Sequence, residues 1–234
     1  MDTQPKLLLI ETATEICAVA VTEGPTIRAQ RIHTQSMAHA RLITVFIEQV
    51  LKEAGWDIQA LHAVVLSKGP GSYTALRVGT SAAKAICYAL DKPLIAVSTL
   101  QALAWAARDT YGSSSNVYYV PMIDARRMDV YTAIYDGHLQ PISPPQPLTL
   151  EAHTFDTFLA QGYTLVFAGN GAAKYQELRS HPHAVFLDQL QCSAAYLAAL
   201  GLEAFTKAQF ESIAHFTPEY IKPPHITTPK KKLC

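Results

Sequence analysis

The chain has 234 residues, enough for one large or two small domains, and a chain of this length buries about 70% of the surface that its unfolded form exposes. Apolar residues make up 49% and charged residues only 16%, which excludes an intrinsically disordered chain and suggests that a partner covers part of the surface. The 19 Lys and Arg residues balance the 19 Asp and Glu residues. This argues against a dedicated nucleic-acid-binding protein, which normally carries a basic excess, so we expect any RNA contact to be local or shared with a partner.

Short apolar runs and helical periodicities alternate along the first half of the chain. Leu42, Phe46 and Val50 belong to an apolar series spaced three and four residues apart, which predicts a helix over 38–54 with Ser36 as its N-cap and Gly55 at its end. Strands are expected over Lys6–Glu11, Ala18–Thr22, Thr26–Ile32, Ala63–Ser67 and Pro93–Val97, and further helices over Thr74–Leu90 and from the cap Ser98 to Arg108.

The second half repeats this alternation and again begins with a predicted hairpin. Asp136-Gly137 is a strong turn signal, and the four prolines of Pro141–Pro147 predict an extended connector. The tail Pro218–Cys234 contains more prolines and the run Lys230–Lys232, so we expect it to be extended and partly mobile. Strands are expected over Tyr118–Ile123, Val130–Tyr135 and Thr164–Ala168, and helices over Glu151–Gln161 and Ser193–Gln209.

This order of elements predicts an α/β protein with a hairpin at the front of each half. Two such halves are compatible with a duplicated ribonuclease-H-like architecture. No apolar stretch approaches the length of a membrane span, and the run Leu7–Ile10 is too short for the core of a signal peptide. We therefore expect a cytoplasmic protein without membrane contact.

The segment Ser67–Arg77 lies between a predicted buried strand and a helix and contains Gly69-Pro70-Gly71-Ser72. The glycines allow tight turns, Ser72 or Thr74 can cap the helix, and free amides with Arg77 could hold an anion. A P-loop needs Gly-Lys-Ser/Thr, which is missing, and the glycine spacing is not that of a Rossmann fingerprint. We favour a tight strand-to-helix turn with a capped helix.

The turn after the first strand reads Glu11-Thr12-Ala13-Thr14. Actin-like phosphate-transfer folds use Asp-x-Gly-Thr here, with the Asp positioning a metal ion and the Gly allowing amides to approach a phosphate. Glu11 and Ala13 replace those two residues, which argues against ordinary nucleotide hydrolysis and favours a polar hairpin turn. Gly169-Asn170-Gly171 could be a second phosphate loop or a plain β–α turn.

The nine histidines and four cysteines suggest no metal site. They form no His-x-x-x-His, His-Glu-x-x-His or Cys-x-x-Cys motif, and His39 is predicted on the polar face of its helix. Cys17 and Cys87 lie in apolar runs and are expected to be small buried hydrophobic residues. At the tip Asp124–Asp129, Asp124 and Arg126 either point into solvent or pair with each other. We assign no catalytic, cofactor-binding or metal-binding residue.

Small residues line one side of the predicted helix Thr74–Leu90. Ala75, Gly79 and Ala83 form a stripe, with further alanines nearby. Small side chains allow another helix to approach closely. This stripe packs either on the chain's own sheet or against a second protein.

Five sequence blocks occur in an order that resembles the bacterial TsaB (YeaZ) family of tRNA threonylcarbamoyladenosine biosynthesis proteins, over essentially the whole chain. The block Gly-Pro-Gly-Ser-Tyr-Thr-Ala-Leu-Arg followed by Val-Ser-Thr-Leu is the most specific. The blocks are Leu9–Thr14, Ser67–Gly79, Ala96–Leu100, Ile123–Arg126 with Val130-Tyr131, and Pro218–Lys222.

The resemblance implies an actin-like (ASKHA) fold with two related subdomains, 1–108 and 109–234, and no cofactor. It implies a non-catalytic partner of TsaD, the paralogue that transfers the threonylcarbamoyl group to the adenosine beside the anticodon of tRNAs reading codons that begin with A. A TsaE-type ATPase joins the complex, and tRNA is reached through it. The family's metal motif His-x-x-x-His belongs to TsaD, and Glu11 departs from the Asp common in the family.

The resemblance also places the partner interface on the helices 38–54 and 74–90. The residues predicted to contact the partner are Leu42, Phe46, Ala75, Gly79, Ala82, Ala83 and Ile86. Two rival functions remain: a metallopeptidase or ATPase that acts alone, and a homodimer that uses the same helix face. The lysines Lys230–Lys232 are expected to give a weak contact to tRNA at most.

Overall fold

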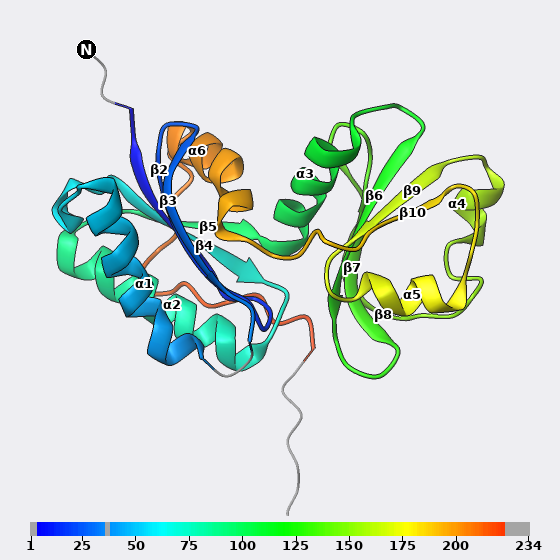
Figure 1. Ribbon diagram of the computed structural model, residues 1–234, viewed down its shortest axis with the longest axis horizontal. Coiled ribbons are helices and arrows are strands. Elements are labelled where there is room, and N and C mark those ends of the chain that lie inside the picture. The colour runs from blue at the N-terminus through cyan, green and yellow to red at the C-terminus, as the bar shows by residue number, and fades with distance from the viewer. Residues whose placement is uncertain (1–3, 36–37, 223–234) are drawn as a thin grey trace, which may run out of the picture.

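The computed structural model describes residues 4–35 and 38–222, which form two α/β halves that lie side by side (Figure 1). In the first half, the hairpin of β1 (Lys6–Glu11) and β2 (Cys17–Glu23) is extended by β3 (Thr26–His33). On the other side of β1, β4 (Ala63–Gly69) and β5 (Leu94–Ser98) add in parallel, so the strand order is β3-β2-β1-β4-β5.

Helices bury both faces of this first sheet. One face packs against α1 (His39–Ala54) and α2 (Tyr73–Leu90), and the short 3₁₀ helix η1 (Ile58–Ala60) lies between α1 and β4. The other face packs against the 3₁₀ helix η2 (Ala194–Leu197) and α6 (Ala198–Thr206). Because both faces are covered, β1 is an almost continuous apolar run rather than an alternating one.

The second sheet repeats the first. Its hairpin of β6 (Val117–Asp124) and β7 (Asp129–Tyr135) is extended by β8 (Pro141–Thr149), while β9 (Thr164–Ala168) and β10 (Ala184–Leu187) add in parallel on the other side of β6. Its order, β8-β7-β6-β9-β10, matches β3-β2-β1-β4-β5 strand for strand. The predicted duplicated ribonuclease-H-like architecture is therefore confirmed.

The two halves exchange helices. The apolar side of α3 (Thr99–Tyr111) packs against β6 and β9 of the second sheet, whereas η2 and α6 return to the first sheet. The helices α4 (Asp156–Ala160) and α5 (Ala172–Leu178) cover the remaining face of the second sheet. The predicted boundary at 108/109 falls within α3, which packs mainly on the second sheet, and the division of the chain there stays a prediction.

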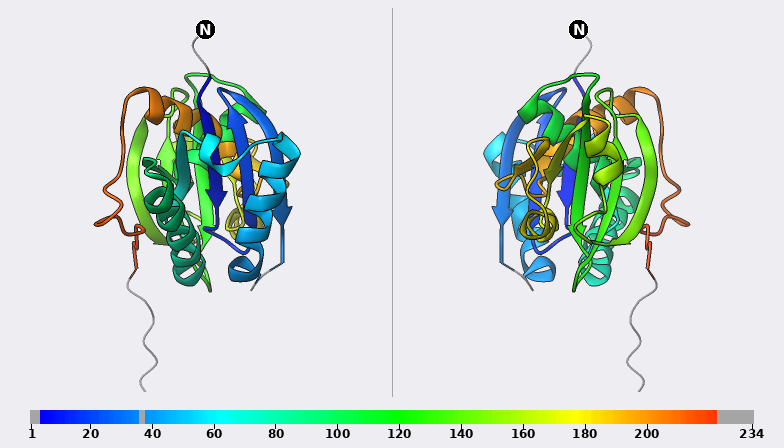
Figure 2. Two further views of the ribbon diagram at one scale, coloured as in Figure 1. Left: turned by 90° about the vertical axis from the view of Figure 1, so that its left-hand side faces the viewer. Right: turned by 90° about the vertical axis from the view of Figure 1, so that its right-hand side faces the viewer.

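After α6 the chain continues to Lys222 along the first half, down one flank of the molecule (Figure 2). The Glu211 N–H donates to the Leu94 carbonyl at 2.8 Å, so this segment partners the outer edge of β5. Among the described residues, no helix is long and apolar enough to cross a membrane.

Most predicted elements are present within a few residues of their expected bounds. Gly55, in a left-handed conformation, ends α1, and Ser98 caps α3 through the Gln101 N–H, as predicted. The predicted cap Ser36 lies outside the described residues, and Ala38 occupies the N-cap position without a side-chain hydrogen bond.

Three predictions for the second half need correction, and two short elements were missed. The expected connector Pro141–Pro147 is the edge strand β8, which tolerates proline because its outer side needs no backbone donors. The predicted helix 151–161 shortens to α4, and the predicted helix 193–209 divides into η2 and α6. The short elements α5 and β10 were not predicted.

Candidate functional site

The loop between β4 and α2 packs directly against the turn between β1 and β2. The Ser72 N–H donates to the Ala13 carbonyl at 2.7 Å, and a Cβ atom at position 71 would clash with that carbonyl, so Gly71 is required for this approach. Ala13 has no exposed surface. The turn backbone is thus covered by the chain itself.

Ser72 is the N-cap of α2, since its side chain accepts the Ala75 N–H at 3.5 Å. Thr74 is exposed in the first turn, and the Arg77 guanidinium donates to the Tyr73 hydroxyl at 2.6 Å and lies over its ring. Gly69 and Pro70 are buried. These positions confirm the tight turn with a capped helix that the sequence favours.

Glu11 is buried behind this loop at the end of β1, with 1% of its surface exposed. One carboxylate oxygen accepts the Ala13 N–H at 2.6 Å and the Ser67 hydroxyl at 2.9 Å. Burial raises the pKa of Glu11 to about 7, although these hydrogen bonds act in the opposite direction. Glu11 therefore links β1 to β4 from inside the protein.

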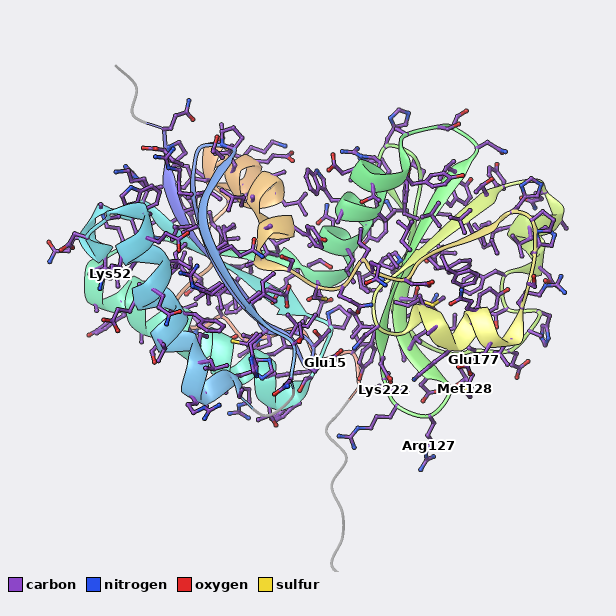
Figure 3. The ribbon with its side chains drawn as sticks, viewed as in Figure 1. Glu15, Lys52, Arg127, Met128, Glu177 and Lys222 are labelled. Atoms are coloured by element: carbon purple, nitrogen blue, oxygen red, sulfur yellow. The ribbon has the colours of Figure 1, made fainter. Side chains whose placement is uncertain are left out.

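A cleft of about 850 Å³ lies between the two halves. Its walls are the β1–β2 turn, the start of α2, the β6–β7 tip, the loop before α5 and residues 219–222. Figure 3 shows Glu15 and Lys222 in this region and Arg127 and Met128 at the β6–β7 tip.

Most charges that line the cleft are paired. Asp124 pairs with Lys174 at 2.7 Å and Asp129 with Lys222 at 2.6 Å, while Glu15 accepts a hydrogen bond from the Asn170 side chain at 2.9 Å. The ion-pair partner of Asp124 is therefore Lys174 rather than Arg126, which the sequence offered as one alternative. The contact between Arg126 and Asp124 runs instead from the Arg126 backbone N–H to the carboxylate, at 2.5 Å.

The small-residue stripe of α2 faces the chain's own core. Ala83 has no exposed surface and packs in the cluster beneath the first sheet, Ala75 is also buried, and a Cβ atom at Gly79 would clash with the Thr12 side chain. The structure therefore corrects the prediction that Ala75, Gly79 and Ala83 contact a partner.

The other four predicted partner residues, Leu42, Phe46, Ala82 and Ile86, are half-buried at the margin of that cluster. The outward sides of α1 and α2 carry further apolar groups that the sequence analysis missed. Tyr88 is 84% exposed and Val45 41% exposed, and Ala85 and Ala89 are also exposed. The signal in the sequence that could have indicated this surface was the aromatic residue Tyr88 within an alanine-rich helix.

The histidines and cysteines form no metal-ligating cluster with acidic residues in the part of the chain that the structure describes. His39 was predicted on a polar face, and this is wrong: it is buried at the start of α1, and its Nε2 lies 3.1 Å from the Ile16 carbonyl oxygen. Cys17 and Cys87 are buried as predicted, and burial raises the pKa of each thiol to about 11.

Two sheets of identical strand order, with exchanged helices and a cleft between them, define a protein of the actin-like class (ASKHA fold). The family model for TsaD, tRNA N6-adenosine threonylcarbamoyltransferase, matches residues 26–231. The chain is 30% identical over 175 residues to the tRNA threonylcarbamoyladenosine biosynthesis protein TsaB of Bacillus subtilis, with 74% of each chain covered.

The TsaB protein of Haemophilus influenzae is 34% identical over 128 residues, which cover 53% of this chain and about half, 51%, of that relative. The structure of YeaZ from Pseudomonas aeruginosa superimposes with a TM-score of 0.79 at 25% identity, covering 92% of this chain and 99% of that one. The chain belongs to the TsaB (YeaZ) family, within the larger group that the TsaD family model describes. The resemblance seen in the sequence blocks is thereby confirmed.

Proposed function

We propose that the chain is a non-catalytic partner subunit in the biosynthesis of N6-threonylcarbamoyladenosine in tRNA. In this proposal it binds a TsaD-type threonylcarbamoyltransferase in the cytoplasm. The observation that carries the proposal is the match to the Bacillus subtilis protein named TsaB across 74% of the chain. A TsaE-type ATPase joins the complex, and tRNA is contacted through the complex rather than by this chain alone.

The outward sides of α1 and α2 are the proposed contact with the TsaD-type partner. Leu42, Phe46, Ala82 and Ile86 are half-buried there, and the more exposed Val45 and Tyr88 extend the same two helices. Apolar and aromatic side chains of this kind are enriched at the centres of protein interfaces. When the partner is absent, the same face would support a homodimer.

A supporting role rather than catalysis fits the hairpin turn. Gly71 and Ser72 pack on Ala13, and the Ser72 N–H already binds the carbonyl of that turn. Glu11 is turned into the interior, where Ser67 and the Ala13 amide bind its carboxylate. The alternative function is an ATPase or metallopeptidase that acts alone.

Charged substitutions on the exposed helix face test the proposal. Val45→Arg and Ala85→Arg each place a cation at the proposed contact, which should cost about 2 kcal/mol or more, roughly thirty-fold in affinity for the TsaD-type protein of the same cell. Leu178→Arg is the matched control, because Leu178 is an exposed apolar residue on α5 in the other half. Titration calorimetry measures the affinities, and light scattering follows conversion of any homodimer into heterodimer.

If both variants bind the TsaD-type protein normally, this face is not the contact. If the wild-type chain forms no complex with that protein, the TsaD-type protein is not its partner. Phosphate release and bound zinc, measured on the isolated chain, address the alternative. ATP turnover that disappears in Glu11→Gln would favour the alternative that the chain is an ATPase that acts alone.

A further inference from the structure

The segment after α6 is held along the first half before it reaches the cleft. The Glu211 amide binds the edge of β5, and the Lys84 ammonium donates to the Phe216 carbonyl at 3.2 Å and to the Ala214 carbonyl at 3.4 Å. Figures 1 and 2 show this segment running down the first half and ending between the two halves. Its last described residues, 218–222, therefore lie at the mouth of the cleft.

Residues 219 and 220 are anchored to the first half. The Glu219 N–H donates to the Lys68 carbonyl at 2.7 Å, and the two side chains form an ion pair at 3.7 Å. The Tyr220 ring lies 4.6 Å from the Tyr73 ring, centroid to centroid, at the first turn of α2. A Cβ atom at Gly69 would lie 2.6 Å from the Glu219 carbonyl oxygen, so this glycine lets the segment approach closely.

Two residues further on, the same segment is anchored to the second half. The Lys222 ammonium pairs with the Asp129 carboxylate at 2.6 Å, at the start of β7. The Thr149 hydroxyl of β8 donates to that carboxylate, and Lys174 of α5 binds the Asp129 backbone carbonyl at 3.0 Å. The hydrogen bond from Lys222 holds the pKa of Asp129 below its usual range. Asp129 is thus a well-positioned acceptor rather than a freely moving surface group.

We propose that Pro218–Lys222 is a clasp that ties the second half to the β4–α2 loop and so sets how far the cleft opens. Domains that close around a cleft hinge about the segments that connect them, and a link across the cleft restricts such motion. Here the chain supplies that link itself, beside the hydrogen bond between Asn170 and Glu15 that also crosses the cleft. The clasp also joins the cleft to the N-terminal turn of α2 through the contact between Tyr220 and Tyr73.

The clasp has one ionic link to the second half, the Lys222–Asp129 pair, among the ion pairs of the described residues. A single partly exposed pair is weak by itself and is screened by salt. It is effective here because the backbone and ring contacts of Glu219 and Tyr220 already hold Lys222 close to Asp129, which reduces the entropy lost when the pair forms. Loss of the pair is therefore expected to open the cleft without unfolding either half.

Spin labels on the two halves measure this opening. Lys52→Cys on α1 and Glu177→Cys on α5 lie on different halves (Figure 3). The native Cys17, Cys87 and Cys192 are buried, and Cys234→Ser removes the fourth cysteine. Pulsed electron paramagnetic resonance measures the distance between the two spin labels. It should give one narrow distance distribution for the full-length chain with its native Lys222.

Lys222→Glu and Asp129→Asn should each broaden the distribution and add population at longer distances. Combining them should add nothing, because both remove the same contact. Lys222→Arg keeps the charge and should keep the narrow distribution. Lys207→Glu is the matched control, since Lys207 pairs with Glu203 at the end of α6, away from the cleft. Raising the salt concentration should broaden the distribution of the native chain but not that of Lys222→Glu.

Thermal melting of each labelled variant checks that both halves remain folded. A narrow distribution unchanged in Lys222→Glu and Asp129→Asn would overturn the proposal. So would equal broadening in Lys207→Glu, or additive effects in the double variant. Tyr220→Ala removes the ring contact at the other end of the clasp but leaves the Glu219 contacts, so it should broaden the distribution less than Lys222→Glu does. An unchanged distribution there would also contradict the proposal.

Discussion

Glu11 shows how a longer, buried carboxylate acts at the turn between β1 and β2. The sequence indicated that a longer carboxylate stands where phosphate-transfer folds place Asp. The structure adds that this carboxylate is buried and bound by Ser67 and the Ala13 amide. A pKa of about 7 means that the folded chain holds a proton that an unfolded chain releases above about pH 4.5.

The pH dependence of stability should reveal this proton. A carboxyl group whose pKa is raised by folding contributes stability that is complete below about pH 4.5 and is lost as the pH rises through about 7. The difference corresponds to roughly 3 kcal/mol of unfolding free energy. Glu11→Gln keeps the acceptor oxygen and cannot ionise, so its unfolding free energy should lack this decrease. Urea unfolding from pH 4.5 to 8, with exposed Glu203→Gln as the control, measures the difference, and parallel profiles for wild type and Glu11→Gln would contradict it.

Gly79 shows why the sequence could not settle which way α2 faces. A glycine at helical spacing from Ala75 and Ala83 predicts a close approach on that side, and this prediction is correct. The approaching group, however, is the Thr12 side chain of the β1–β2 turn, 67 positions earlier in the chain, rather than a partner helix. Periodicity identifies a face of a helix, but it carries no information about what covers that face.

At the scale of the element, the two sides of α2 should respond oppositely to the same substitution. Ala83→Arg forces a long cation into a fully buried site, at a cost above about 4 kcal/mol, which is much of the 5–15 kcal/mol stability of a typical domain. Ala85 is exposed two residues later, so Ala85→Arg should change stability by less than about 0.5 kcal/mol. Thermal melts and soluble yields compare them, and a normally folded Ala83→Arg would show that α2 packs differently.

The strands and helices that the sequence predicted well are those with strong, long patterns. The bounds of β1 and β9 agree residue for residue, and α1 and α2 differ by one residue at their starts. The strand β8 was missed because its prolines oppose strand formation, and only its position at the sheet edge makes them tolerable. The helix α5 and the strand β10 are short, so packing on the second sheet stabilises α5, and pairing with β9 stabilises β10, more than their local sequences do.

At the scale of the whole molecule, the repeated α/β architecture was predictable from the two hairpin-first halves, but the five-strand order of the second sheet and the exchange of helices were not. The apolar residues of α3 immediately follow β5 in sequence, yet they pack on β6 and β9 of the other sheet. In the same way, η2 and α6 follow the second sheet and cover the first. The order of elements in the sequence suggests that consecutive elements pack together. Only the packing of the two cores shows which sheet each helix covers.

This exchange predicts how the molecule behaves when it is divided at 108/109. Residues 1–108 contain most of α3, whose apolar side belongs to the other half, and lack η2 and α6, which leaves Leu7, Leu9 and Val65 uncovered on the first sheet. Exposed apolar surface of this kind leads to aggregation, so fragment 1–108 should be insoluble when produced alone. Coexpression with 109–234 supplies both missing contacts and should yield a soluble complex of the two fragments. Affinity purification through a tag on either fragment measures this, and a monomeric, cooperatively melting fragment 1–108 would show that the first half is complete without the helices of the second.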